Sequence, residues 1–258
     1  MLELREIRKL YPEHLHPFGR SLLREYLQYK ILQIVFDSPY ADRLSFLGGT
    51  ALRIVHNNRR FSEDLDFDNF GLSKSEFESV VQVVRQGLER EGYIVETRTV
   101  SKGAYRCYIR LPRILFDNNL SGYEEEKILI QIDTLSQGFS YIPEKFLLQK
   151  FEVFTEIFVT PVDVLLSQKI YALFNRKRPK GRDFFDIAFL FPLTRPNYEY
   201  LDKKLGISDP ENLRMKLKEF CSSVDLQGLA HDVQAFLFDP KEVKRVLLFE
   251  RAVDVATL

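Results

Sequence analysis

The stretch LGGTALRIVHNNRRFSEDLDFDNF, residues 47–70, decides the fold of this 258-residue chain. Residues 44–47 form a short apolar run that ends at a pair of glycines, and the helical pattern ALRIVHN follows directly. Residues 64–70 then alternate polar and apolar side chains, which is typical of a strand. We therefore expect a strand, a glycine turn, a helix and a second strand, in this order.

Three aspartates occupy alternate positions of the predicted second strand: Asp64, Asp66 and Asp68. Alternate side chains share one face of a strand, so the aspartates should line a solvated face and Leu65 and Phe67 the core. Cα atoms two apart are separated by roughly 6–7 Å, which lets two carboxylates reach ions held ~3.5–4 Å apart. Such carboxylates repel one another unless a cation is present. The pattern indicates a metal site, and a polar strand edge is the alternative. A calcium-binding EF-hand loop does not fit, because the sequence has Asn69 where that loop requires glycine and Ser75 where it requires glutamate.

The glycine turn at Gly48 and Gly49, followed by Thr50, adds a second signal. A glycine turn that leads into a helix offers bare backbone N–H groups and a positive helix end to phosphates. Next to an acid pair, it predicts a phosphate-binding bend beside a metal site.

With these motifs, residues 47–70 closely resemble the first motif of the DNA-polymerase-β-like nucleotidyltransferases, in particular the AbiEii toxin branch with its GG-T-x-L and R-x-S-x-D-L-D-F patterns. Residues 165–187, LLSQKIYALFNRKRPKGRDFFDI, are similar to the second half of that pattern, K-x-x-A-L, an arginine and R-D-x-x-D. The resemblance covers roughly residues 44–190. It implies an α+β fold: a polymerase-β-like core with a mixed sheet flanked by helices in residues 1–150, and a helical C-terminal domain in residues 151–258 that completes the active site.

The resemblance also implies roles for single residues. Asp64 and Asp66 would hold Mg²⁺ or Mn²⁺ on a nucleoside triphosphate (NTP). Asp133 fits the third carboxylate that the family commonly adds, which completes the metal shell or accepts the proton of the attacking hydroxyl. The isoleucines of residues 127–133 face one side and leave Asp133 on the other; an acid that merely ends a strand is the alternative. The residues implied to bind the nucleotide are Gly48, Gly49, Thr50, Arg60, Ser62, Lys169 and Arg176.

In the second motif, Lys169 would neutralise triphosphate charge in the transition state. Taken alone, a lysine beside apolar residues more often extends to solvent. Asp183 and Asp186 stand three apart on a predicted helix and share a face. One would hold Lys169 or Arg182 in position and one would act as a base, unless both merely offset the helix dipole.

The implied activity is transfer of a nucleoside monophosphate from an NTP to an acceptor by a toxin of a toxin–antitoxin or phage-defence system. Related toxins act on the 3′ end of tRNA, and the five cations of residues 176–182 suit a phosphate backbone. RNA is therefore the expected acceptor, and a cognate antitoxin the expected protein partner. The alternatives are a protein or small-molecule hydroxyl as acceptor, and a nucleotide-binding scaffold without catalysis.

Composition limits the class of protein. Lys+Arg and Asp+Glu both number 37, so no overall charge attracts nucleic acid or membrane. The two cysteines lie far apart without a CxxC motif, which argues against disulfides and zinc. No signal peptide and no apolar run of membrane-spanning length are apparent, so a cytoplasmic protein is expected.

The rest of the chain gives weaker predictions. Residues 20–36 predict an amphipathic helix, and Ser73 with Glu76 predicts a capping box that begins a helix ending at Gly92. Three further strands are expected at residues 93–100, 105–111 and 127–135. After Pro143 helices should dominate, with a helix start at Thr160 as the cap and Pro161 in the first turn.

Overall fold

The computed structural model describes residues 2–258. The chain divides into two compact units. The described residues of unit 1 lie within Met1–Ala51 and Phe61–Val159, and unit 2 comprises Leu52–Arg60 and Thr160–Leu258. Each unit is described separately below.

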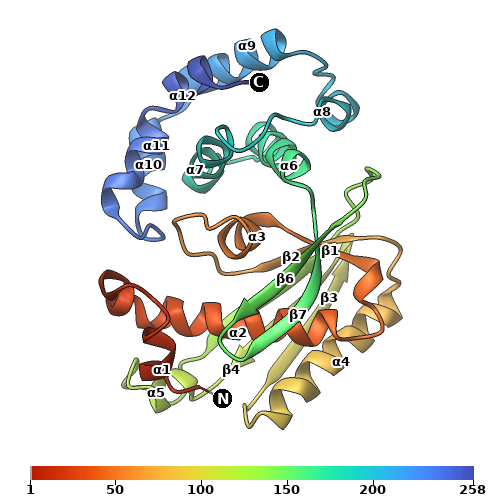
Figure 1. Ribbon diagram of the computed structural model, residues 1–258, viewed down its shortest axis with the longest axis vertical. Helices are drawn as coiled ribbons and strands as arrows, with labels where there is room; N and C mark the ends of the chain where they lie inside the picture. Colours follow the sequence, from red (N-terminus) through yellow and green to blue (C-terminus); the bar gives the residue numbers. More distant parts are fainter. Residues whose placement is uncertain (1) are drawn as a thin grey trace. The chain divides into compact units, whose positions relative to one another are not determined.

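Unit 1 is built on one seven-stranded sheet with the strand order β3-β4-β5-β2-β1-β7-β6 (Figure 1). The pairs β2/β5 and β1/β7 are parallel and the other neighbours are antiparallel, so the expected mixed sheet is confirmed. The strands are β1 (Leu44–Leu47), β2 (Leu65–Asn69), β3 (Glu96–Lys102), β4 (Ala104–Leu111), β5 (Ile128–Thr134), β6 (Glu144–Lys150) and β7 (Val153–Val159).

Two long helices, α2 (Gly19–Phe36) and α4 (Lys74–Arg90), cover one face of this sheet. Phe36 of α2 packs on Phe67 of β2 with ring centroids 6.0 Å apart, and Phe77 of α4 stacks on Tyr105 of β4 at 5.6 Å. Each such buried ring stabilises the fold by about 1.5–3 kcal/mol. Because side chains alternate along a strand, the neighbours of these core residues face away from α2 and α4. The remaining helices of unit 1 are α1 (Leu4–Arg8), the first residues of α3 (Gly48–Ile54) and α5 (Ile114–Asp117), with 3₁₀ turns at Glu13–Phe18 and Ala41–Arg43.

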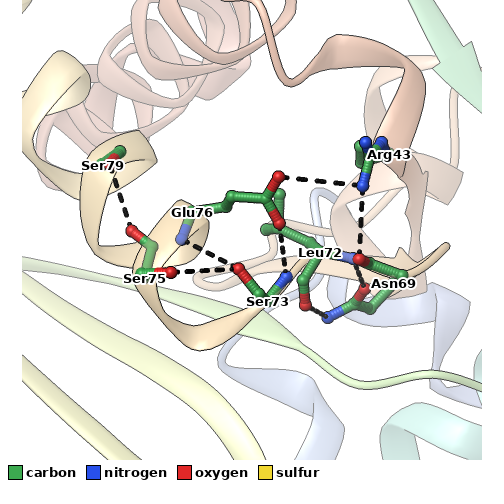
Figure 2. A network of polar contacts seen from close by, with 8 residues as sticks. Arg43, Asn69, Leu72, Ser73, Ser75, Glu76 and Ser79 are labelled. Atoms are coloured by element: carbon green, nitrogen blue, oxygen red, sulfur yellow. Dashed lines mark hydrogen bonds and ion pairs between the residues drawn. The ribbon is translucent and has the colours of Figure 1, made fainter.

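The start of α4 carries the predicted capping box (Figure 2). The Glu76 N–H donates to the Ser73 hydroxyl at 3.3 Å, and the Ser73 N–H donates to the Glu76 carboxylate at 2.8 Å. These bonds to Ser73 lower the pKa of Glu76. Asn69 and Leu72 exchange two further hydrogen bonds just before the helix. The end of β2 is thereby tied to the beginning of α4.

The helical part begins later than the sequence suggested. The prediction that helices dominate after Pro143 is wrong, because residues 144–159 form the β6–β7 hairpin of unit 1. Alternate residues of β7 are buried and exposed, a two-residue period that the high apolar content of this stretch concealed. The helix start is also different in detail: Pro161, not Thr160, is the N-cap, and it makes no side-chain capping bond.

Unit 2 is helical and closes around an aromatic core. Phe184 packs edge-on against Phe249 at 4.9 Å and stacks on Phe220 at 6.1 Å. Residues 52–60 belong to it, and Arg60 pairs with Leu237 as an isolated β-bridge. Its helices are α6 (Val162–Asn175), α7 (Gly181–Leu190), α8 (Tyr198–Leu205), α9 (Pro210–Ser222), α10 (Leu226–Gln234), α11 (Lys244–Leu247) and α12 (Phe249–Val255), with a 3₁₀ turn at Pro240–Val243.

Candidate functional site

The glycine bend of unit 1 lies directly against one of the predicted metal-binding acids. Gly48 follows β1 with a φ of 81°, a left-handed conformation that favours glycine. A Cβ at this position would overlap Oδ2 of Asp66 and lie 3.0 Å from its Cβ. The pairing of Leu47 with Asp66 in the β1/β2 register brings the two together. Bend and carboxylate therefore form one site.

A hydrogen bond from Thr50 fixes the first turn of α3 to the other acid. The Thr50 side chain is fully buried, and its hydroxyl donates to the backbone carbonyl of Asp64. Asp64 immediately precedes β2, and both it and Asp66 are partly exposed. The hydroxyl of Thr50 thus has a structural role, which leaves its backbone as the part able to meet a phosphate.

Asp133 is the neighbour of Asp66 on the adjacent strand. The two residues are register partners in the parallel pair β2/β5, where strands run about 4.8 Å apart. Arg106 on β4 donates to one oxygen of Asp133 at 2.6 Å, and Gln131 donates to the other at 2.8 Å. The hydrogen bond to Asp133 raises the pKa of Arg106. Asp133 thus lies beside Asp66 and is already paired with an arginine, which the sequence did not reveal.

Asp68 differs from the other two aspartates of its strand. It is only 1% exposed and accepts hydrogen bonds from the backbone of Gln137 at 2.8 Å and from the hydroxyl of Tyr141 at 2.9 Å. The expectation that all three aspartates line a solvated face is wrong at this position. Asp68 instead anchors the segment that follows β5.

The donors of unit 1 fit an ion of the magnesium type. Within residues 2–258 no group of three or more His, Cys, Asp and Glu side chains is gathered as a metal cage. Mg²⁺ is usually held by one or two carboxylates, with substrate phosphates and water completing its shell. Asp66 beside the Gly48 bend, with Asp64 two residues before it, supplies that kind of incomplete, oxygen-only donor set.

In unit 2, the carboxylate of Asp186 is fully buried and has a partner on every side. Arg60 donates to both of its oxygens, at 2.7 and 2.6 Å. Asn58 donates to Oδ1 at 2.8 Å, and Lys169 Nζ lies 2.7 Å from Oδ2. Burial alone would raise the pKa of Asp186, but the charges of Arg60 and Lys169 outweigh it and lower the pKa to about 2. A carboxylate held in this way is a poor proton acceptor.

Asp183, one turn earlier on α7, is also buried and paired. Its Oδ2 lies 2.7 Å from Nε of Arg176, and its Oδ1 lies 3.9 Å from Nζ of Lys169. Lys169 therefore stands between two carboxylates while its side chain stays 14% exposed. Arg182, the other cation considered for these acids, lies over the ring of Phe236 at 4.9 Å instead.

Two further residues of the first motif that are expected to bind the nucleotide, Arg60 and Ser62, have partners in the structure. Arg60 is 2% exposed and faces Asp186. Ser62 contributes its backbone carbonyl to a hydrogen bond from the Gln28 amide at 3.0 Å. The Arg60–Asp186 and Asn58–Asp186 bonds join residues more than 120 apart in sequence, and no local pattern announced them.

Comparison with known families identifies the class of enzyme to which this chain belongs. The model of the family "Nucleotidyl transferase AbiEii toxin, Type IV TA system" matches residues 30–225. This range includes the glycine bend, the aspartates of β2, and Lys169 with its carboxylate partners. The chain belongs to the AbiEii family. It is therefore a nucleotidyltransferase of a toxin–antitoxin family, as the motif resemblance implied.

Two solved structures share the fold of this AbiEii-family chain. A protein of H. pylori proposed to be a nucleotidyltransferase has a TM-score of 0.60 and 20% identity, with 91% of this chain and 93% of that chain covered. JHP933 from Helicobacter pylori has a TM-score of 0.56 and 18% identity, with 91% and 90% covered. No curated protein sequence matches the chain. Within residues 2–258, no helix combines the length and the apolar character needed to cross a bilayer.

Gly48→Ala is expected to abolish nucleotidyl transfer. The new methyl group must displace the Asp66 carboxylate, and the left-handed backbone adds strain of about 1–3 kcal/mol. Transfer rates and urea unfolding of purified variants measure the two effects. Gly92→Ala is the matched control, because Gly92 also has a positive φ, 93°, but nothing lies within 4 Å of its added Cβ. If both variants lose the same stability and both keep transfer activity, the close contact between position 48 and the Asp66 carboxylate is not needed for nucleotidyl transfer.

Proposed function

We propose that this AbiEii-family enzyme transfers a nucleoside monophosphate from an NTP to the 3′ end of an RNA, with tRNA as the first candidate. The packing of Gly48 against Asp66 is the observation that carries the proposal. It joins the bend implied to meet phosphate to a carboxylate implied to hold metal. Asp133 adds a third carboxylate on the adjacent strand.

Asp64 and Asp66 would hold Mg²⁺ or Mn²⁺. The ion, when bound, supplies positive charge to the triphosphate oxygens and to the attacking hydroxyl. The 3′ oxygen of the acceptor forms a bond to the α-phosphorus, and the bond from that phosphorus to the β-phosphate bridging oxygen breaks, releasing pyrophosphate. Asp133 is the candidate acceptor for the hydroxyl proton once Arg106 has turned away; the Arg106 side chain is 41% exposed and has room to move.

Lys169 would neutralise charge on the polyphosphate during transfer. This role is supported by the difference in exposure between Lys169 and its partner. The carboxylate of Asp186 is fully buried, whereas the side chain of Lys169 is 14% exposed. We assign Asp186 and Asp183 as positioning residues for Lys169 and Arg176, because both carboxylates are ion-paired and at most 3% exposed, whereas that of Asp133 is 23% exposed. A general-base role suits neither.

The RNA acceptor is supported by an exposed cationic segment in unit 2. Arg176, Lys177, Arg178 and Lys180 are all exposed at the surface between α6 and α7. Such a run neutralises phosphates without reading sequence. A toxin that consumes NTP and modifies tRNA would act in the cytoplasm, and its family implies regulation by a cognate antitoxin and a contribution to phage defence.

The proposal is tested by incubating the protein with each α-³²P-labelled NTP and total RNA, with Mg²⁺ present or chelated. Label is expected to enter the tRNA band only with Mg²⁺ and with the wild-type protein. Label in a protein band instead would favour a protein hydroxyl as acceptor. If no NTP gave transfer to RNA, protein or small molecules, the proposed activity would be contradicted. A nucleotide-binding scaffold without catalysis would then be the remaining alternative.

A further inference from the structure

The sheet face that carries Asp66 and Asp133 continues outward as an arginine-rich surface on β4 and β3. In the β4/β5 register Arg106 pairs with Asp133, Tyr108 with Gln131 and Arg110 with Leu129. In the β3/β4 register Arg98 pairs with Tyr108. Register partners point to the same face of a sheet. The outer-sheet surface is defined as Arg98, Arg106, Tyr108 and Arg110.

Contacts of the intervening residues show that this surface lies opposite α4. Tyr105 of β4 stacks on Phe77 of α4, and Cys107 next to it is fully buried. Thr97 and Thr99 of β3 line a hollow together with residues of α4. The residues between them, including Arg98, therefore point away from the helix, and Arg98 is exposed.

The charge of the outer-sheet surface is not cancelled by its neighbours. On the three outer strands β3, β4 and β5, the acids of this face are already paired: Asp133 with Arg106, and Glu96 with Lys127, whose ammonium lies 2.8 Å from it. Within the described residues 2–258, neither Arg98 nor Arg110 forms an ion pair. Arg110 instead lies over the ring of Tyr108, with its guanidinium carbon 5.8 Å from the centroid. Two uncommitted cations thus flank an aromatic ring.

We infer that the outer-sheet surface binds the single-stranded 3′ end of the RNA acceptor, an inference that rests on the proposed function. Proteins bind single-stranded nucleic acid by combining cations along the backbone with aromatic rings on which bases stack. From strand spacing and rise, Tyr108 lies about 12 Å from Asp66, the span of a short single-stranded segment. An acceptor strand held by Arg98, Tyr108 and Arg110 would deliver its terminal hydroxyl to Asp66 and Asp133.

The test measures binding of a fluorescent 12-nucleotide single-stranded RNA by anisotropy, without NTP or metal. Arg98→Ala/Arg110→Ala is expected to weaken RNA binding about tenfold or more. Because each lost phosphate contact lowers the slope of log Kd against log salt concentration by about 0.7, the double variant should show a slope shallower by about 1.4. Tyr108→Ala should also weaken binding, while Tyr108→Phe, which keeps the ring, should bind as wild type does. Arg251→Ala, at an exposed arginine of α12, is the matched control and should change neither quantity.

Each outcome has a definite meaning. Wild-type affinity and salt slope in Arg98→Ala/Arg110→Ala would overturn the inference and leave the proposed transfer to RNA intact. Loss of RNA binding only in Lys177→Ala/Arg178→Ala would overturn it in favour of the cationic segment of unit 2. Two outcomes would overturn both the inference and the proposal that RNA is the acceptor. One is that the wild-type protein does not bind RNA; the other is that an acidic peptide competes for the surface and unlabelled RNA does not. Thermal unfolding of every variant, followed by circular dichroism, confirms that surface substitutions have left the fold intact.

Discussion

Replacing Asp186 with alanine is expected to lower the free energy of unfolding by about 3–5 kcal/mol. The substitution removes the carboxylate that accepts hydrogen bonds on both of its oxygens from the Arg60 guanidinium, which is 2% exposed. It also takes away the closest anionic partner of Lys169. A buried charge that loses its partner cannot recover the lost interaction from water, so the cost is much larger than for a surface pair.

Urea unfolding followed by circular dichroism measures this loss, with Asp254→Ala as the matched control. Asp254 also pairs with a cation, Lys218 at 2.9 Å, but both side chains are more than 40% exposed. Such a pair contributes about 0–1 kcal/mol. Equal losses in the two variants would contradict the assignment of Asp186 as a buried structural anchor.

Acidification gives a second readout for the same residue. The pKa of Asp186 is lowered from 3.8 to about 2, so the stability it contributes is present above pH 3.8 and is lost as the pH falls through about 2. The shift corresponds to about 2 kcal/mol. Between pH 5 and pH 2 the wild-type protein should therefore lose about that much more stability than Asp186→Asn. An identical pH dependence in both proteins would show that Asp186 does not keep its charge in the folded state.

Replacing Asp66 with alanine is expected to reduce nucleotidyl transfer by at least about 10³-fold without unfolding the protein. The carboxylate lies at the bend of Gly48 and next to Asp133, where it would bring metal and phosphate together. Its removal relieves like-charge repulsion and exposes no large cavity, because the side chain is already partly exposed. The measurements are transfer of labelled NTP and urea unfolding.

Asp68→Asn is the matched control for Asp66→Ala, because both residues lie on β2 and point to the same face. Asp68 is buried and engaged by Gln137 and Tyr141, so its substitution should lower stability while transfer remains measurable. The opposite pattern, with transfer retained in Asp66→Ala and lost in Asp68→Asn, would move the metal site to Asp68 and refute the assignment made here.

The local features of the fold could be predicted from sequence because short-range physics controls them. The capping box of Ser73 and Glu76 involves residues only three apart. The bend at Gly48 has a left-handed backbone conformation, which glycine adopts more readily than other residues. The β6–β7 hairpin could not be predicted, because its apolar residues suit a helix as well as a strand and only pairing in the sheet selects the latter.

The partners of the site residues depended on long-range contacts. Asp133 was placed on the correct face by alternation, but Arg106, which neutralises it, stands 27 residues away on another strand. Likewise, the sequence could not show that Arg60 would face Asp186, since 126 residues separate them. A motif therefore predicts which residue types are present, while tertiary packing decides which of them remain available for chemistry.

The central claim is that Asp64 and Asp66, beside the Gly48 bend, hold a metal ion on a triphosphate. Titration of Mn²⁺, followed by electron paramagnetic resonance with a non-hydrolysable NTP analogue, tests it most directly on the wild-type protein and on Asp66→Ala. The wild-type protein should bind Mn²⁺ in a manner that requires the nucleotide, and Asp66→Ala should bind it at least about tenfold more weakly. Equal, nucleotide-dependent Mn²⁺ binding by both proteins would contradict the claim.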